Sequence, residues 1–70
     1  MQRLNAAALR VLEHLKAHGS ALNWELAAPE LGGLRAAGRV WELVQDGHDI
    51  RKEHVERGTW RYRYYGVKSL

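Results

Sequence analysis

Two arginines in the middle of the chain are the side chains best suited to binding chemistry. Arg35 and Arg39 stand four residues apart in the stretch LGGLRAAGRVWEL, residues 31–43, so a helix through this stretch places both on one face. Each guanidinium is a planar fork that can hold guanine O6 and N7 with two hydrogen bonds. The alternative is that both side chains only solvate the helix and pair with Glu42 or Glu25.

The histidine and serine side chains form no recognisable active site. His14 and His18 are four residues apart, a spacing that can hold a metal, but no third ligand accompanies them and surface histidines are the simpler interpretation. Ser20 lacks histidine and aspartate partners at an identifiable spacing. Gly32–Gly33 are not followed by the Lys-Ser or Lys-Thr of a phosphate-binding loop. We therefore expect no catalysis, no metal and no cofactor.

The positive charge is concentrated in the second half of the chain. Residues 1–33 contain three basic and three acidic side chains, so the net charge of +3 belongs to residues 34–70, with eight basic and five acidic groups. From Arg57 onward there are basic residues and no acid. A one-sided basic surface is the electrostatic signature of a polyanionic partner.

Length and composition favour a single small domain over residues 1–70. A chain of 70 residues buries only about 60% of its unfolded surface, so its core is thin. The absence of cysteine excludes disulfides and cysteine-based zinc sites, and it fits a cytoplasmic protein. No apolar run approaches the roughly 20 residues of a membrane span, so we expect no membrane association.

The first helix is predicted over residues 5–18, NAAALRVLEHLKAH. Asn5 can cap its free amides, and Gly19 stands where a left-handed residue would end it. Its apolar face is predicted to contain Leu4, Ala8, Leu12 and Leu15.

Two further helices are predicted on either side of a glycine turn. Asn23 is a second N-cap candidate for a helix over about 24–31, which Pro29 should shorten or kink. Gly32–Gly33 form the turn, and a third helix follows over 34–46 until Gly47. Its inward stripe is predicted to be Ala36, Ala37, Val40, Leu43 and Val44. Trp24 is expected to pack against the core or the turn, and Trp41, at the edge of the stripe, is expected in the core.

After Gly47 the hydrophobic period changes from 3.6 to 2. The segments HDIRKEHV and TWRYRYYG therefore predict two strands. Residues 56–59 join them as a hairpin in which Gly58 can adopt a positive φ. Residues 20–22 are long enough only for a short third strand or bridge. The predicted class is α+β, with three helices followed by a two-stranded hairpin.

This order resembles a winged helix-turn-helix domain over about residues 5–66. The resemblance is sharpest at S-x-x-N-W-E-L from Ser20, L-G-G-L-R from Leu31 and R-V-x-E-L from Arg39, followed by Gly47 and Ile50. The same series is similar to small winged-helix proteins of phages and prophages. The resemblance implies a double-stranded DNA-binding protein, and we expect a small transcriptional regulator.

The resemblance also assigns roles to individual residues. The helix over 34–46 would enter the major groove, with Arg35 and Arg39 contacting bases. The hairpin over 56–59 would be the wing, a contact to phosphate or the minor groove. Its expected DNA-binding residues are Arg57, Thr59 and Arg61. Asn23 would have one of two roles. It would only cap the second helix, or it would cap that helix at a site where a DNA phosphate docks.

Gly38 has no assigned role at this point, because glycine costs about 1 kcal/mol relative to alanine inside a helix. A close approach to DNA or to the second helix would explain it.

Other functions remain open. The same scaffold can be a protein-interaction module presenting Trp24, Trp41 or the tyrosine-rich strand, or an architectural, excisionase-like or packaging protein. A homodimer is compatible with reading paired half-sites, with Leu4, Val67 and Leu70 as candidate contacts.

Overall fold

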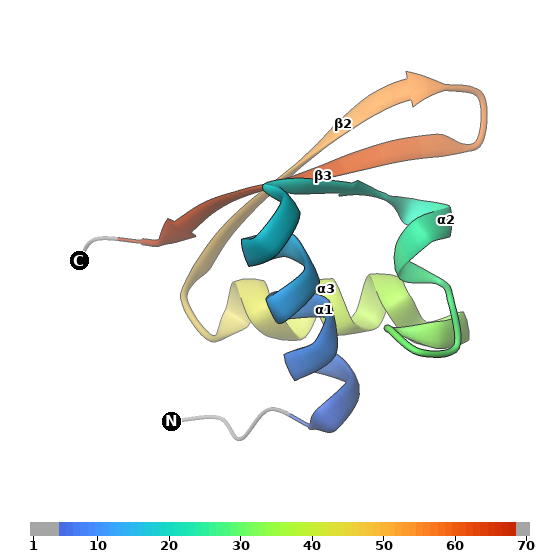
Figure 1. The fold of residues 1–70 in the computed structure, drawn as a ribbon. Coiled ribbons are helices and arrows are strands. Elements are labelled where there is room, and N and C mark those ends of the chain that lie inside the picture. The colour runs from blue at the N-terminus through green and yellow to red at the C-terminus, as the bar shows by residue number, and fades with distance from the viewer. Residues whose placement is uncertain (1–4, 69–70) are drawn as a thin grey trace.

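The computed structural model describes residues 5–68 and contains three α-helices against one small sheet. In Figure 1, helix α1 (Ala6–His18) crosses helix α3 (Ala36–Gln45) on one side of the sheet, and the hairpin of strands β2 (His48–Glu56) and β3 (Thr59–Val67) extends beyond the helices. The short helix α2 (Asn23–Leu26) lies near the outer part of the hairpin. The predicted α+β winged architecture is confirmed. Leu4 and Leu70 lie outside the described residues.

Helix α1 begins and ends at the predicted residues. The side chain of Asn5 accepts a hydrogen bond from the Ala8 amide at 2.8 Å. Gly19 adopts a φ of 80° and donates its amide to Leu15 O at 2.7 Å. This left-handed residue ends the helix and turns the chain directly into the sheet.

The short strand β1 (Ser20–Leu22) completes an antiparallel sheet in the order β1-β3-β2. Ala21 is opposite Tyr62 on β3, which in turn is opposite Lys52 on β2. The hairpin turn forms at the predicted position, where Gly58 has a φ of 76°. The central strand β3 therefore connects the helical part of the domain to the wing.

Helix α2 is much shorter than predicted, since it spans Asn23–Leu26 and not 24–31. The prediction that Asn23 is the N-cap is wrong: Leu22 occupies that position, and its amide donates to the Glu25 carboxylate at 2.8 Å. Pro29 lies in the turn that follows. The helix ends early because proline removes an amide donor and restricts the residue before it.

The third predicted helix is divided into two parts. A 3₁₀ turn, η1 (Gly33–Arg35), precedes α3, so the α-helix does not extend from 34 to 46. Gly32 lies so close to α3 that a Cβ on it would stand 2.8 Å from Ala36 Cα. The tight glycine turn is confirmed, and it accounts for the constrained entry into α3.

The core is small and entirely aliphatic. Its buried residues are Ala8, Val11, Leu12, Leu15, Ala21, Leu26, Ala36, Val40 and Leu43, with Leu31, Ile50, Tyr62 and Tyr64 packed against it. On α3 the predicted stripe is confirmed at Ala36, Val40 and Leu43, but Ala37 is exposed and Val44 only half-buried.

Trp41 was expected in the core and Trp24 against the core or the turn, and both side chains are largely exposed. Trp24 is 62% exposed and Trp41 is 60% exposed. Trp41 follows buried Val40, and one residue of α-helix turns by about 100°. The narrow buried stripe therefore does not reach Trp41, and the prediction that this residue lies in the core is wrong.

Candidate nucleic-acid interface

The outward face of α3 is largely apolar. Gly38, Trp41 and Gln45 are exposed at intervals of three and four residues, so they form one stripe along the helix. Leu34, in η1 immediately before α3, is fully exposed at 104%. The face available to a partner therefore includes a leucine and a tryptophan beside the predicted arginines.

Arg35 is exposed and stands at the N-cap position of α3. No hydrogen bond or ion pair within residues 5–68 engages its guanidinium. A free guanidinium at the start of this helix has all of its donors available for a base or a phosphate.

Arg39 is in a different state. Its Nη1 donates to both carboxylate oxygens of Glu42, at 2.5 and 3.2 Å, and its side chain is only 19% exposed. The premise that it shares an exposed face with Arg35 is wrong, and pairing with Glu42, the alternative raised from the sequence, is found. The Nε atom of Arg39 is buried without a partner. The Nη1 donor of Arg39 is therefore occupied by Glu42, and that donor must exchange its partner before it can contact a base.

Asn23 connects α2 to the wing. Its Nδ2 donates to Gly58 O at 3.2 Å, and its Oδ1 accepts the Trp60 amide at 3.0 Å. Both hydrogen-bonding functions of one carboxamide are thus used on the two sides of the hairpin turn. Sequence reasoning missed this contact, because its partners lie 35 and 37 residues away along the chain.

The predicted wing residues differ in availability. Arg57 is exposed at the turn, and no ion pair within residues 5–68 engages it. Thr59 is half-buried opposite Glu56 in the hairpin register. Arg61 Nη1 donates to Glu53 at 3.1 Å, which reduces the field of that guanidinium. Arg57 is therefore the most accessible cation of the predicted wing.

Glu53 binds two arginines on the hairpin. Besides the contact from Arg61, Nη2 of Arg63 lies 2.9 Å from the same carboxylate oxygen. Hydrogen bonds from Arg63 and then Arg61 hold the pKa of the Glu53 carboxyl below its usual value of 4.5. The side chain remains a carboxylate at neutral pH and neutralises part of the positive charge of Arg61 and Arg63.

Cations also cover two aromatic rings of the hairpin. Lys52 Nζ lies 4.7 Å from the centroid of the Trp60 ring, and His54 packs against the same ring with centroids 4.6 Å apart. On the other face, Arg51 lies 4.6 Å from the Tyr65 centroid. Each of these cation–π contacts stabilises the hairpin by roughly 0.5–1 kcal/mol at an exposed site. The period-2 pattern predicted the strands but did not reveal these pairs.

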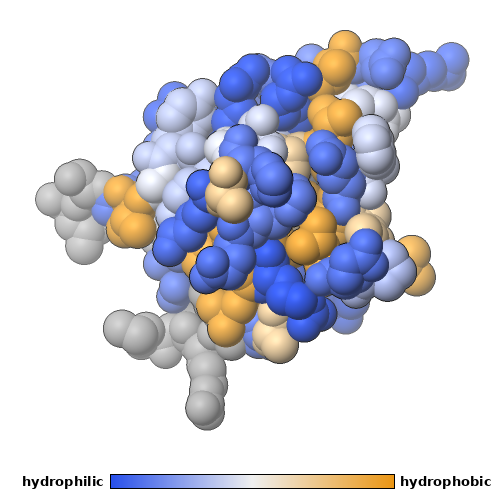
Figure 2. Space-filling model, in the orientation of Figure 1, coloured by the Kyte–Doolittle hydropathy of each residue, from blue (hydrophilic) through white to orange (hydrophobic). Residues whose placement is uncertain are grey.

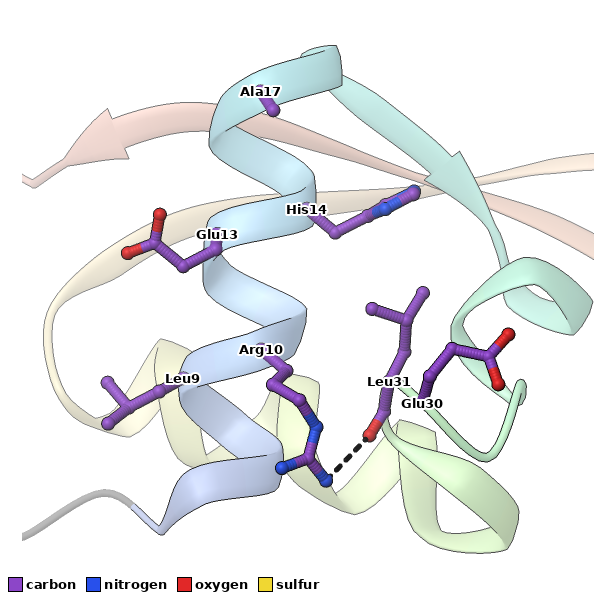
Figure 3. A pocket seen from close by; sticks show the side chains of 7 residues that line it. All are labelled: Leu9, Arg10, Glu13, His14, Ala17, Glu30 and Leu31. Carbon is purple, nitrogen blue, oxygen red and sulfur yellow. Dashed lines mark hydrogen bonds between the residues drawn. The ribbon is translucent and has the colours of Figure 1, made fainter.

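A separate groove of about 510 Å³ lies between α1 and the loop before α3 (Figure 3). Its wall includes Leu9 and Leu31, and Arg10 Nη2 approaches Leu31 O at 3.5 Å. His14 packs against His18, with 4.4 Å between the ring centroids. Within residues 5–68, no group of three or more histidine, aspartate or glutamate side chains is arranged to hold a metal. The face of the molecule drawn in Figure 2 is mainly hydrophilic, with separate apolar patches.

No helix in the part of the chain that the structure describes is long and apolar enough to cross a membrane.

Comparison with known proteins identifies the family. A family model described as a winged helix-turn-helix domain matches residues 7–66. The chain therefore belongs to the winged helix-turn-helix family, whose members are typically non-enzymatic DNA-binding domains. Neither the search of curated proteins nor the search of solved structures gave a match.

Proposed function

We propose that this protein binds double-stranded DNA as a small transcriptional regulator, with α3 in the major groove and the wing on the backbone or minor groove. The observation that carries the proposal is the pairing of an unengaged Arg35 at the start of α3 with a wing that Asn23 holds against α2. The remaining proposed contacts are Arg39, Arg57, Thr59 and Arg61.

The two exposed arginines have different proposed tasks. Arg35 reads a base edge, and one bidentate arginine–guanine contact gives about 1–3 kcal/mol of discrimination. Arg57 contacts a phosphate, and one such contact contributes about 0.9 to the slope of log affinity against log salt concentration. Arg39 also contacts a base, after a base or a DNA phosphate has displaced Glu42 from its guanidinium.

The test is selection from a pool of random duplexes, followed by titrations at several salt concentrations. The variant R35A should lose sequence preference at the base that Arg35 reads, whereas R57A should weaken binding to all duplexes alike and lower the salt slope by about 0.9. The control is K16A, which removes one exposed charge from α1 and should change neither preference nor slope to this extent. Absent or salt-independent binding by the wild type contradicts the proposal, as does an equal effect of K16A.

A second candidate function is a protein-interaction module, which the exposure of Trp24 and Trp41 favours. An architectural, excisionase-like or packaging role is separated from repression by footprint length and DNA bending. The proposal includes a cytoplasmic location and an association with phages. It also includes homodimerisation on paired half-sites.

A further inference from the structure

The exposed face of α3 has an apolar strip, which we define as Leu34, Ala37, Gly38 and Trp41. All four residues are exposed, Leu34 at 104% and Trp41 at 60%. The strip contains no charged side chain, and no acid occurs from Gly33 to Trp41. Gln45 continues the same face one turn beyond Trp41.

We propose that this strip contacts the C5 methyl groups of thymines in the major groove, so that α3 selects A·T pairs by apolar contact. This inference rests on the proposed DNA-binding function and specifies what the helix reads. The thymine methyl is the apolar group among the base edges of the major groove. The carboxamide of Gln45 matches N6 and N7 of an adenine, so the same face is suited to both bases of an A·T pair.

Gly38 supplies an independent reason. A Cβ at this position would meet nothing within 4 Å, and its φ is not positive. Neither the packing of the domain nor its backbone conformation therefore requires glycine, although glycine weakens a helix by about 1 kcal/mol relative to alanine. A close approach to α2 is excluded as the explanation. A surface that comes nearer to the helix axis between Leu34 and Trp41 accounts for the missing side chain.

The charges beside the strip favour DNA over an apolar protein surface as its occupant. Arg35 flanks the strip with a free guanidinium, while the nearest acid, Glu42, is paired with Arg39. The strip is thus apolar with one free guanidinium beside it, which suits methyl groups lying between phosphates. A protein partner or a second copy of the chain is an outcome of the test below.

The first experiment replaces thymine by deoxyuridine, which removes only the methyl group, at each position of a selected duplex. Loss of one buried methyl should weaken wild-type binding about four-fold, the change expected for one buried CH₂-sized group. Substitution outside the footprint should have no effect. The variants L34A and W41A should bind the thymine duplex more weakly and lose most of the difference between thymine and deoxyuridine. The matched control L9A, a second exposed leucine on α1, should keep it.

The second experiment uses G38A, which should unfold at the same or a higher temperature than the wild type and yet bind the duplex at least several-fold more weakly. Wild-type binding that ignores deoxyuridine, or unchanged binding by G38A, overturns the thymine inference and leaves the DNA-binding function standing. Failure of the wild type to bind any duplex at low salt overturns both. If L34A and W41A change the molar mass in light scattering but not DNA affinity, the strip is a protein contact and the inference is wrong.

Discussion

Removing the carboxamide of Asn23 should release the wing from α2. The two hydrogen bonds, at 3.2 Å to Gly58 O and 3.0 Å from the Trp60 amide, lie at the surface. A typical hydrogen bond contributes about 0.5–1.5 kcal/mol net, so exposed bonds belong in the lower half of that range. We therefore expect N23A to reduce the free energy of wing docking by about 1–2 kcal/mol.

Amide hydrogen exchange measures this change directly, because the Trp60 N–H donates to Asn23. A change of one to two kcal/mol corresponds to about 5–30-fold in an opening equilibrium. The Trp60 amide should therefore exchange about 5–30-fold faster in N23A, whereas amides of α1 should change much less.

Two further variants separate wing docking from general destabilisation. N23D keeps an acceptor for the Trp60 amide but sets a carboxylate oxygen against Gly58 O, so its Trp60 protection should lie between that of N23A and that of the wild type. N5A removes another asparagine side chain, the α1 cap, which lowers global stability by about 1 kcal/mol and should not accelerate Trp60 preferentially. Unchanged Trp60 exchange in N23A, or equal acceleration in N5A, would refute the assignment of Asn23 as the residue that holds the wing.

The other predictions concern the glycine turn and the carboxylate of the wing. G32A should lower the midpoint of thermal unfolding, because its Cβ would stand 2.8 Å from Ala36 Cα. Such overpacking costs about 1–3 kcal/mol, and each kcal/mol lowers the midpoint by roughly 4–8 °C in a domain of this size. An unchanged midpoint would contradict the close packing at this turn. The pKa of Glu53 is lowered in the folded state, so its stabilising contribution is present above its unfolded pKa and is lost as the pH falls through the folded value. Unfolding midpoints of wild type and E53Q should therefore differ at neutral pH and converge in acid, and a constant difference would exclude Glu53 as the titrating group.

Local chemistry made the ends of α1 and the hairpin turn predictable from the sequence. Asn5 caps a neighbour three residues away, and Gly19 and Gly58 occupy positive-φ positions that glycine adopts without strain. The partner of Arg39 was one of two alternatives, because Glu42 is three residues along the same helix. Each of these features depends on residues that are close in the chain.

Contacts between distant elements could not be predicted in the same way. Asn23 looked like a helix cap, since asparagine before an apolar run satisfies that local pattern. Its carboxamide instead meets the hairpin turn, and only the pairing of β1 with β3 brings these segments together. The length of α2 was wrong for a related reason, because periodicity alone did not indicate how strongly Pro29 ends a short helix.

The exposure of the tryptophans follows from the size of the core. Within residues 5–68 the buried core consists of nine residues, all alanine, valine or leucine, and an indole is larger than any of these side chains. Trp60 has partners within the domain, Lys52 and His54. Trp41 lies on the exposed face of α3 beside Gly38, a residue with open space above it. The exposed ring of Trp41 and the missing side chain of Gly38 thus lie three residues apart on one helix, where the core requires neither of them.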